Sequence, residues 1–321
     1  SDIADGSVTV TTSGTVDTTT AGTYTLTYSA TDSAGNAASA VTRTVIVADT
    51  MAPIITLSGS ASVNHEQGTT YSDAGASASD SVDGSVSVTT SGTVDTATAG
   101  TYTLTYTATD SAGNAATTVT RTVIVADTVV PVITLSGSAS VNHEQGTAYT
   151  DEGATASDLV DGTISVGTTG SVNFNVVGTY TLTYTATDSA GNAATAVTRT
   201  VIVADTVAPV ITLSGTTSVN HEQGTTYVDA GASASDSVDG SVSVTTSGTV
   251  DTDTAGTYTL TYTATDSAGN AATALTRTVI VADTVVPVIT LSGSASVNHE
   301  QGVTYSDAGA SASDSVDGSV S

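Results

Sequence analysis

The stretch GTYTLTYTATD, residues 100–110, alternates between two kinds of side chain without a break. Threonines fill the odd-numbered positions, and the even-numbered positions carry Tyr102, Leu104, Tyr106 and Ala108. Successive side chains of a strand point to opposite faces, so this period of two collects the apolar residues on one face. The stretch therefore predicts an antiparallel strand with one buried face and one threonine-lined face toward solvent.

Shorter runs with the same alternation lie on both sides of this stretch. Their apolar positions are Ile55, Leu57 and Val63; Ala74, Ala76 and Ala78; Val86 and Val88; and Val119, Val123 and Val125. Turn sequences rich in Gly, Asp and Asn separate the runs about every ten residues, which is typical of a sandwich or barrel. No window has a helical period. The sequence predicts an all-β fold built from seven-strand β-sandwiches.

The whole pattern recurs along the chain with a period of 78 residues. This spacing separates the prolines that open PIITLSG or PVITLSG, which are Pro53, Pro131, Pro209 and Pro287. A period of this length fits a small domain and is too long for a solenoid repeat. We therefore predict an extended rod of three complete repeats, 51–128, 129–206 and 207–284, with partial repeats at 1–50 and 285–321.

The composition excludes several classes of protein. The 31 acidic residues face only 4 basic ones, all arginine, and the net charge is −27. Such a chain cannot neutralise the phosphates of a nucleic acid, and no apolar run approaches the roughly 20 residues of a membrane-spanning helix. Cys and Lys are absent, which leaves few nucleophiles and bases, so we do not expect an enzyme.

Three motifs carry a resemblance to a known family. They are DTxxPVITLSG, the stretch ExGxxYxDxGAxAxDxVDG, and AGTYTLTYTATDSAGNAAT followed by TRTVIVAD. Together they resemble the Ig-like domains of bacterial surface proteins, relatives of the hyalin repeat that occur in tandem in giant adhesins. The sequence AGTY also places Tyr102 where Ig domains have their tyrosine corner, with Leu104 in place of the second Cys. The resemblance implies tandem Ig-like sandwiches in an extracellular, cell-surface stalk, often stiffened by calcium at domain junctions.

Acidic residues gather in the loops that lie near the linkers. If the strands run up and down, the loops beginning at Asp80 and Asp110 return to the end where the chain enters the repeat, beside Asp49. The VNHEQG turn then lies at the opposite end, where Glu66 faces the linker residue Asp127. Calcium requires six to eight oxygen ligands and readily takes them from separate loops.

Two junctions are complete within the chain, and the sequence predicts a calcium site at each. The first would use Glu66, Asp127, Asp158, Asp161, Asp188 and Asn192. The second would use Glu144, Asp205, Asp236, Asp239, Asp266 and Asn270. The corresponding residues at the entrance of repeat 51–128 are Asp49, Asp80, Asp83, Asp110 and Asn114.

Other interpretations of these polar residues stay open. Asp in DG and DSAGN is also an ordinary turn former, and acidity at a surface also confers solubility. The single histidine per repeat is too few nitrogen ligands for a transition-metal site, so we expect a surface turn residue. Gln67 allows a Thr–Gln ester cross-link, whereas the absence of Lys excludes a Lys–Asn isopeptide bond. For Arg121 we expect a stem packed inward and a head that reaches a carboxylate at the rim.

Near identity of the repeats favours a structural function, because a spacer needs only length whereas a binding site needs one distinctive copy. We expect an extender that projects an adhesive tip or forms a surface fibre. One alternative is a ligand-binding module in the third repeat along the chain, where residues 173–178 include the only Phe. Another is ice binding by rows of threonine, which the twist of a sheet opposes.

Both ends of the chain fall in the middle of a repeat, near DSVDG. We therefore expect these residues to be a window taken from a longer array. In that array, copies of the repeat would follow one another head to tail, and each partial repeat would be completed by the next copy.

Overall fold

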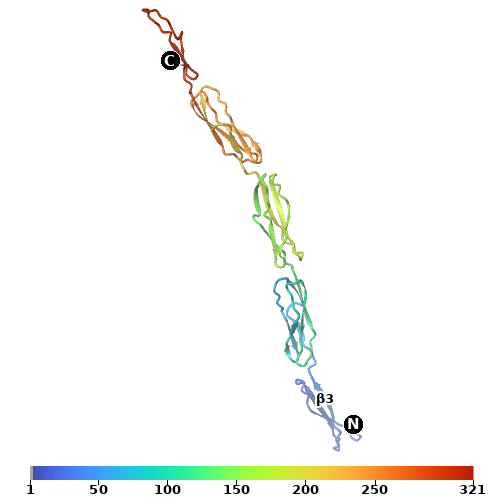
Figure 1. The fold of residues 1–321 in the computed structure, drawn as a ribbon. Helices are drawn as coiled ribbons and strands as arrows, with labels where there is room; N and C mark the ends of the chain where they lie inside the picture. The colour runs from blue at the N-terminus through green and yellow to red at the C-terminus, as the bar shows by residue number, and fades with distance from the viewer. Residues whose placement is uncertain (1–2, 321) are drawn as a thin grey trace. The chain divides into compact units, whose positions relative to one another are not determined.

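The computed structural model describes residues 3–320, and the regular structure of these residues is β-strand throughout (Figure 1). The outermost residues of the predicted partial repeats, 1–2 and 321, lie outside the described part. The fold class is all-β, as predicted. In repeat 51–128 the strands are β4 (Ile54–Leu57), β5 (Ser62–Glu66), β6 (Ala76–Asp80), β7 (Gly84–Val86), β8 (Thr89–Ser91), β9 (Gly100–Thr107) and β10 (Val119–Ala126).

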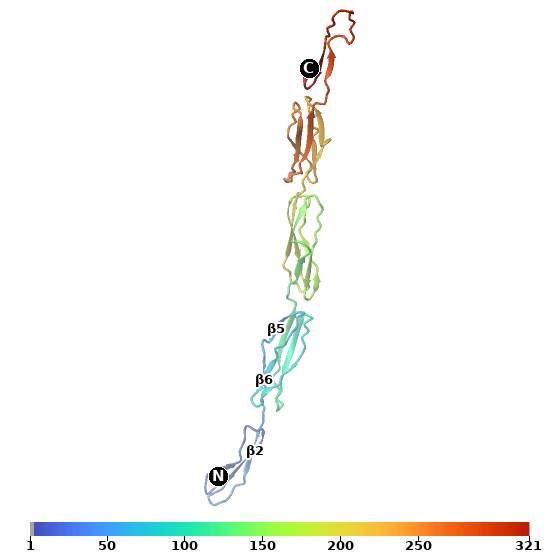
Figure 2. The same ribbon diagram turned by 90° about the vertical axis from the view of Figure 1, so that its left-hand side faces the viewer.

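These seven strands form two sheets, with the orders β4-β6-β7 and β5-β10-β9-β8. Figure 2 labels β5 and β6, which belong to different sheets of this repeat. The predicted seven-strand sandwich is therefore present.

The same seven strands recur in the next two repeats. In repeat 129–206 they are β11 (Val132–Leu135), β12 (Ser140–Glu144), β13 (Ala154–Asp158), β14 (Gly162–Ile164), β15 (Gly167–Thr169), β16 (Gly178–Thr185) and β17 (Val197–Ala204). In repeat 207–284 they are β18 (Val210–Leu213), β19 (Ser218–Glu222), β20 (Ala232–Asp236), β21 (Gly240–Val242), β22 (Val244–Ser247), β23 (Gly256–Ala264) and β24 (Leu275–Ala282). Their sheet orders repeat those of the first complete repeat.

Each partial repeat forms one three-stranded sheet. The first has the order β1-β2-β3, with β1 (Val10–Ser13), β2 (Gly22–Ala30) and β3 (Val41–Val47). The second has the order β25-β26-β27, with β25 (Val288–Leu291), β26 (Ala310–Asp314) and β27 (Gly318–Val320). They correspond to β8-β9-β10 and to β4-β6-β7 of a complete repeat.

By its contacts the chain divides into two compact units. The first comprises the chain up to Val132 together with Ala156–Ile164, where β13 turns into β14, and the loop Thr187–Ala194, and the second comprises the remainder. The β13–β14 turn and one loop of repeat 129–206 thus belong to the unit that contains the preceding linker. The boundaries placed between the repeats from the sequence stay a prediction.

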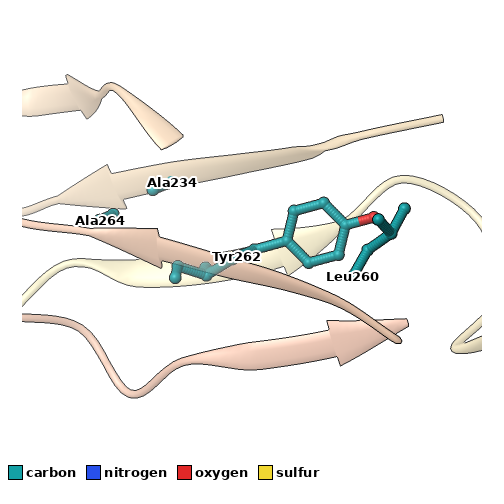
Figure 3. Packing of buried hydrophobic residues seen from close by; sticks show 5 residues of the cluster. Ala234, Leu260, Tyr262 and Ala264 are labelled. Atoms are coloured by element: carbon teal, nitrogen blue, oxygen red, sulfur yellow. The ribbon is translucent and has the colours of Figure 1, made fainter. Parts of the chain in front are cut away.

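The alternation of β9 produces the core of each sandwich. Leu104 and Tyr106 are buried, and Thr103 and Thr107 are exposed. In repeat 207–284 the equivalent core consists of Ile211, Ala234, Leu260, Tyr262 and Ala264, four of which are labelled in Figure 3. Alanine supplies little apolar area, so each core is thin and depends on its tyrosine and leucine.

The first predicted strand differs from the prediction, because it divides between the two sheets. Gly59, with a φ of 85°, lies in the left-handed region that glycine adopts without strain, and the chain turns there between β4 and β5. β4 pairs antiparallel with β6, whereas β5 pairs parallel with β10. The register of the parallel pair runs from Ser62 beside Thr122 to Glu66 beside Ala126.

Arg121 lies in the core with only 1% of its surface exposed. Its Nη1 forms an ion pair with Asp73, and its Nε donates to the Ser60 carbonyl at 3.0 Å. The guanidinium also lies over the Tyr106 ring, 5.6 Å from the ring centroid. The expected carboxylate partner is thus present, and the head group is buried more deeply than expected for a rim position.

Candidate metal sites at the linkers

The loop after β13 is shaped by two aspartates. Asp158 Oδ1 accepts hydrogen bonds from the amides of Val160, at 2.7 Å, and Asp161, at 3.3 Å. Asp161 in turn accepts from the Ser189 amide at 2.6 Å and from its hydroxyl at 2.8 Å. The DG turn therefore forms as its sequence predicts, and Asp161 ties it to the loop that follows β16.

That second loop is organised by Asp188. Its Oδ1 accepts from the Asn192 amide at 2.7 Å, and its Oδ2 accepts from Asn192 Nδ2 at 2.8 Å. Asn192 Nδ2 also donates to the backbone carbonyl of the linker residue Asp127, at 3.2 Å. The asparagine thus joins the loop to the linker.

Three aspartates converge where these two loops meet the linker. Asp127, Asp158 and Asp188 each offer a carboxylate oxygen, and the three oxygens lie within 4.8 Å of one another. Within the described residues, similar groups occur at two further linkers: Asp49, Asp80 and Asp110, and Asp205, Asp239 and Asp266. The predicted convergence of linker and loops is therefore present at the level of side chains.

Among the described aspartates of the linkers and of the loops beside them, six carboxylate oxygens are buried without a hydrogen-bond partner. They are the Oδ2 atoms of Asp49, Asp127, Asp158, Asp205, Asp236 and Asp314. Buried polar atoms of folded proteins are almost always partnered, and an unpartnered one carries its full desolvation cost. A cation bound among the oxygens would supply the missing partner, and carboxylates are hard ligands of the kind that calcium takes.

The electrostatics of the cluster are unfavourable in the absence of a cation. Burial raises the pKa of Asp127, and the negative charge of Asp158 raises it further. Burial also raises the pKa of the linker residues Asp205 and Asp283. Burial likewise opposes ionisation of Asp188, but hydrogen bonds from Asn192 outweigh it and lower the pKa of that carboxyl.

The predicted glutamate ligands have other partners. Glu66 accepts hydrogen bonds from the Thr128 amide, at 3.0 Å, and from the Thr128 hydroxyl, and Glu144 bonds Thr206 in the same way. Glu66 still lies close enough for its charge to raise the pKa of Asp127. These glutamates border the clusters, and their carboxylates fix the chain immediately after the linker aspartate.

Some of the remaining predicted ligands belong to the converging groups, and others form hydrogen bonds with loop or linker residues. Asp83 and Asp161 bind the loop serines Ser111 and Ser189. At the third linker the converging group contains Asp239 in place of Asp236, although Asp236 keeps an orphaned oxygen and its charge raises the pKa of Asp205. The amides of Asn114, Asn192 and Asn270 all donate to the linker carbonyl.

The other singled-out residues have structural roles. His65 lies in β5 and not in a turn, with Nε2 3.2 Å from the Thr69 carbonyl oxygen and its ring edge-on to Tyr71. The side-chain Nε2 of Gln67 donates a hydrogen bond to the Ala97 carbonyl at 2.8 Å. Tyr102 donates to the Thr98 carbonyl at 2.8 Å, which is the backbone bond of a tyrosine corner.

Sequence reasoning missed the partner of Arg121. Asp73 accepts from the Tyr106 hydroxyl at 2.9 Å as well as from the guanidinium. Its place in the YxDxG motif once per period was the available signal, because a single buried arginine per repeat needs one recurring carboxylate.

The described residues form no helix of the length and apolarity needed to cross a membrane.

Comparisons with known proteins give the following similarities. None of the curated proteins matches the chain in sequence. Among solved structures, Drosophila N-cadherin EC1-4 is 14% identical over 83% of this chain and 86% of its own, with a TM-score of 0.24. The sialic acid binding region of a Streptococcus sanguinis SK1 adhesin is 16% identical over 74% of this chain and 79% of its own, with a TM-score of 0.20.

The M60 catalytic domain with the CBM51-1 and CBM51-2 domains of Clostridium perfringens ZmpB is 16% identical over 85% of this chain, with a TM-score of 0.20. The chain spans only 35% of the length of that structure. TM-scores this low carry no argument about function.

The comparison with family models is much more specific. The model described as "Bacterial surface protein, Ig-like domain" matches residues 1–47, 55–125, 133–203 and 211–281. Each match falls within one predicted repeat, and together they cover most of the chain. The chain therefore belongs to the family of bacterial surface protein Ig-like domains.

Proposed function

We propose that the chain is an extracellular spacer of a bacterial surface adhesin, stiffened by calcium at the linkers between its Ig-like repeats. The observation that carries this proposal is the group formed by Asp127, Asp158 and Asp188, in which buried oxygens lack a partner. Membership of a bacterial surface family supports the cell-surface location.

Calcium suits this group for two reasons. The ligands come from a linker and two separate loops, and calcium accepts six to eight oxygens in flexible geometry, with carbonyls and waters completing the set. Three carboxylates at one point also repel one another, and a divalent cation removes that repulsion. A bound ion would tie the linker to both loops and restrict bending at the junction.

The spacer role follows from what the repeats share. The three complete repeats have the same strands, the same buried arginine and the same loop hydrogen bonds. In residues 51–284, which are described throughout, every Arg is buried and Lys is absent, so each repeat presents an acidic surface. Such surfaces repel one another and keep long arrays soluble and separate. In the cell, we expect further copies of the repeat to follow head to tail.

The changed loop of repeat 129–206 does not require a separate binding function. The Phe174 carbonyl accepts from the Gly146 amide at 2.9 Å, as the Thr96 carbonyl accepts from Gly68 at 2.8 Å. The loop thus keeps its backbone anchor although its side chains differ, which agrees with neutral variation in a spacer.

Calorimetric titration of the chain with calcium, after removal of divalent ions, tests the ligand. We expect saturable binding that Asp127→Asn combined with Asp205→Asn reduces at both complete junctions. The matched control is Asp253→Ala, which removes one carboxylate outside the clusters and introduces the residue that repeat 51–128 has at this position, Ala97. Absence of binding by the unaltered chain, or equal loss in the control, would contradict the proposal.

Small-angle scattering tests the stiffening separately. With calcium we expect a longer and less flexible particle than in chelator, and a much smaller difference for the double Asp→Asn variant, in which only the group of Asp49, Asp80 and Asp110 remains intact. An identical profile in both buffers would favour the interpretation that the acidic loops only confer solubility.

A further inference from the structure

We propose that each complete repeat is a load-bearing unit, in which β5 and β10 and their equivalents form a shear clamp between the entry and exit of the chain. The proposal rests on the spacer function, because only a chain held at both ends carries tension. It does not involve calcium, since none of the clamp bonds belongs to the aspartate clusters.

The direction of the strands decides how tension would act. The chain enters the repeat through β4 and β5 and leaves it through β10, and β5 lies parallel to β10. In parallel neighbours, the start of one strand and the end of the other lie at opposite ends of the pair. Tension on the two ends of the repeat therefore slides the strands past each other and loads all their hydrogen bonds together.

An antiparallel terminal pair would respond differently. Its entry and exit would lie at the same end, and tension would open the hydrogen bonds one after another. Breaking several bonds in one step has a higher barrier than breaking them singly, and forced unfolding is governed by that barrier. The five register pairs from Ser62–Thr122 to Glu66–Ala126 thus act as one unit.

Arg121 extends the clamp toward the entry of the chain. From β10 it reaches the segment before β5, where Nε donates to the Ser60 carbonyl and Nη2 to the Ser58 carbonyl. The Thr122 amide adds a bond to the Ala61 carbonyl at 2.9 Å. Arg121 is buried, so water cannot easily replace these bonds as they are strained, and Asp73 holds the guanidinium in place.

The exit end is closed by two further contacts. The backbone amide of Gln67 donates to the Ala126 carbonyl at 3.0 Å. The Glu66 carboxylate accepts from the amide and the hydroxyl of Thr128. Residues 58–67 are thus bonded to residues 121–128 along their whole length.

The other complete repeats contain the same clamp. Their parallel pairs are β12 with β17 and β19 with β24. Their arginines donate to the equivalent carbonyls: Arg199 to Ser136 and Ser138, and Arg277 to Ser214 and Thr216. The described part of the chain therefore holds three clamps.

Pulling one repeat in two directions tests the clamp. The chain has no cysteine, so introduced thiols define the attachment points in the full chain. Ala52→Cys with Val129→Cys pulls on the entry and exit, in shear. Thr70→Cys with Val129→Cys pulls from the end where β5 terminates beside β10, which peels β10 from its neighbours. The two pulling directions and the Thr128→Val and Asp95→Ala variants are all measured in chelator, so that calcium at the linkers cannot contribute.

We expect the repeat to survive at least about tenfold longer at a given force in shear than in peeling, because several bonds must break at once. Equal lifetimes in the two directions would overturn the proposal. The calcium proposal would be unaffected, because its failure appears as missing calorimetric binding and not as a changed lifetime in chelator.

A local variant tests the exit contact. Thr128→Val removes the hydroxyl that donates to Glu66 and keeps the backbone amide that also donates to it. We expect the lifetime in shear to become about tenfold shorter, because a hydrogen bond to a charged group is lost. The control is Asp95→Ala, which removes a bond to the Ala97 amide outside the clamp. A lifetime unchanged by Thr128→Val, or shortened equally by the control, would exclude a role for this contact in the clamp.

Discussion

Two buried groups of charges recur once per repeat, and they are opposite in kind. In the sandwich core, Arg121 is paired with Asp73 and bonded to the carbonyls of Ser58 and Ser60. At the linker, Asp127 and Asp158 each leave an oxygen buried without a partner. The fold satisfies the first group from its own residues and leaves the second incomplete.

The difference separates charges that the fold satisfies with its own residues from charges for which we propose a bound cation. A buried ion pair stabilises a fold only when hydrogen bonds satisfy its remaining donors and acceptors, and the Arg121 group meets that condition. Three converging carboxylates without a cation lower stability. Their recurrence at three linkers is not required by the sandwich, and it supports the proposal that they bind a cation.

The largest expected effect comes from breaking the satisfied group. Replacing its carboxylates, by Asp73→Asn, Asp151→Asn and Asp229→Asn, leaves each buried arginine without a countercharge. We expect each complete repeat to lose about 3 kcal/mol of unfolding free energy, the lower end for a broken buried pair because the carboxylate is partly exposed. Denaturant unfolding measures the loss, and Asp95→Ala with Asp253→Ala should change it little.

Binding of calcium to the linker aspartates should have an effect of similar size and opposite sign. Calcium at about 100 times its dissociation constant should add about 2.7 kcal/mol per occupied site, if it binds only the folded chain. Calorimetric unfolding with calcium and with chelator measures the gain. Asp127→Asn with Asp205→Asn should abolish the gain at both complete junctions, whereas the Asp73→Asn set should keep it.

Alkaline pH should destabilise the buried group of Arg121, Asp73 and Tyr106 and leave the linker aspartates unaffected. Burial raises the pKa of Tyr106 to about 12, and its hydrogen bond to Asp73 contributes; Tyr184 and Tyr262 behave alike. A raised pKa means that the stabilisation is complete below the ordinary value of 10.0 and is lost as the pH rises through about 12.

Absorbance of phenolate during an alkaline titration follows this ionisation. We expect three of the 12 tyrosines, a quarter of the amplitude, to ionise near pH 12 together with unfolding. Ionisation of all tyrosines in one step near pH 10 would contradict the burial of these hydroxyls.

The smallest expected effect is a difference in response to acid without calcium. Burial opposes ionisation of Asp73, but bonds from Tyr106 and Arg121 outweigh it and lower its pKa, so its stabilisation is lost only as the pH falls below the ordinary 3.8. The pKa of Asp127 is raised, so its unfavourable ionisation is relieved already above 3.8.

In chelator the melting temperature should therefore rise slightly on acidification and then fall steeply. Calorimetry from neutral to strongly acidic pH measures both limbs. The Asp127→Asn and Asp205→Asn variant should lose most of the rise and keep the fall, and a monotonic decrease in the unaltered chain would show that the linker carboxylates are not strained.

The sequence predicted the faces of the strands and the convergence of the loops, because both follow from local rules. Alternation places Leu104 and Tyr106 on one side of β9 whatever else the chain does. Asp158 and Asp188 form turns with their own neighbours. Up-and-down strands then bring those turns to the same end as the linker.

Sequence patterns did not predict the contacts that depend on distant segments. The parallel pairing of β5 with β10 brings the Glu66 carboxylate to Thr128, a contact that the alternation of the strands does not predict. That pairing follows from the turn at Gly59, where the chain passes from one sheet to the other. Alternation describes faces and contains no information about which strands become neighbours.

The arginines separate the effect of the local sequence from the effect of tertiary packing. Arg43 and Arg121 lie in the same sequence, TRTVIV, on strands of the same register, and each lies over its neighbouring tyrosine ring. Arg43 is nevertheless exposed, whereas Arg121 is buried. The local sequence determines the direction of the side chain. Its burial depends on residues 58–75, which fold over Arg121 and supply Asp73 and the carbonyls that make a buried charge tolerable.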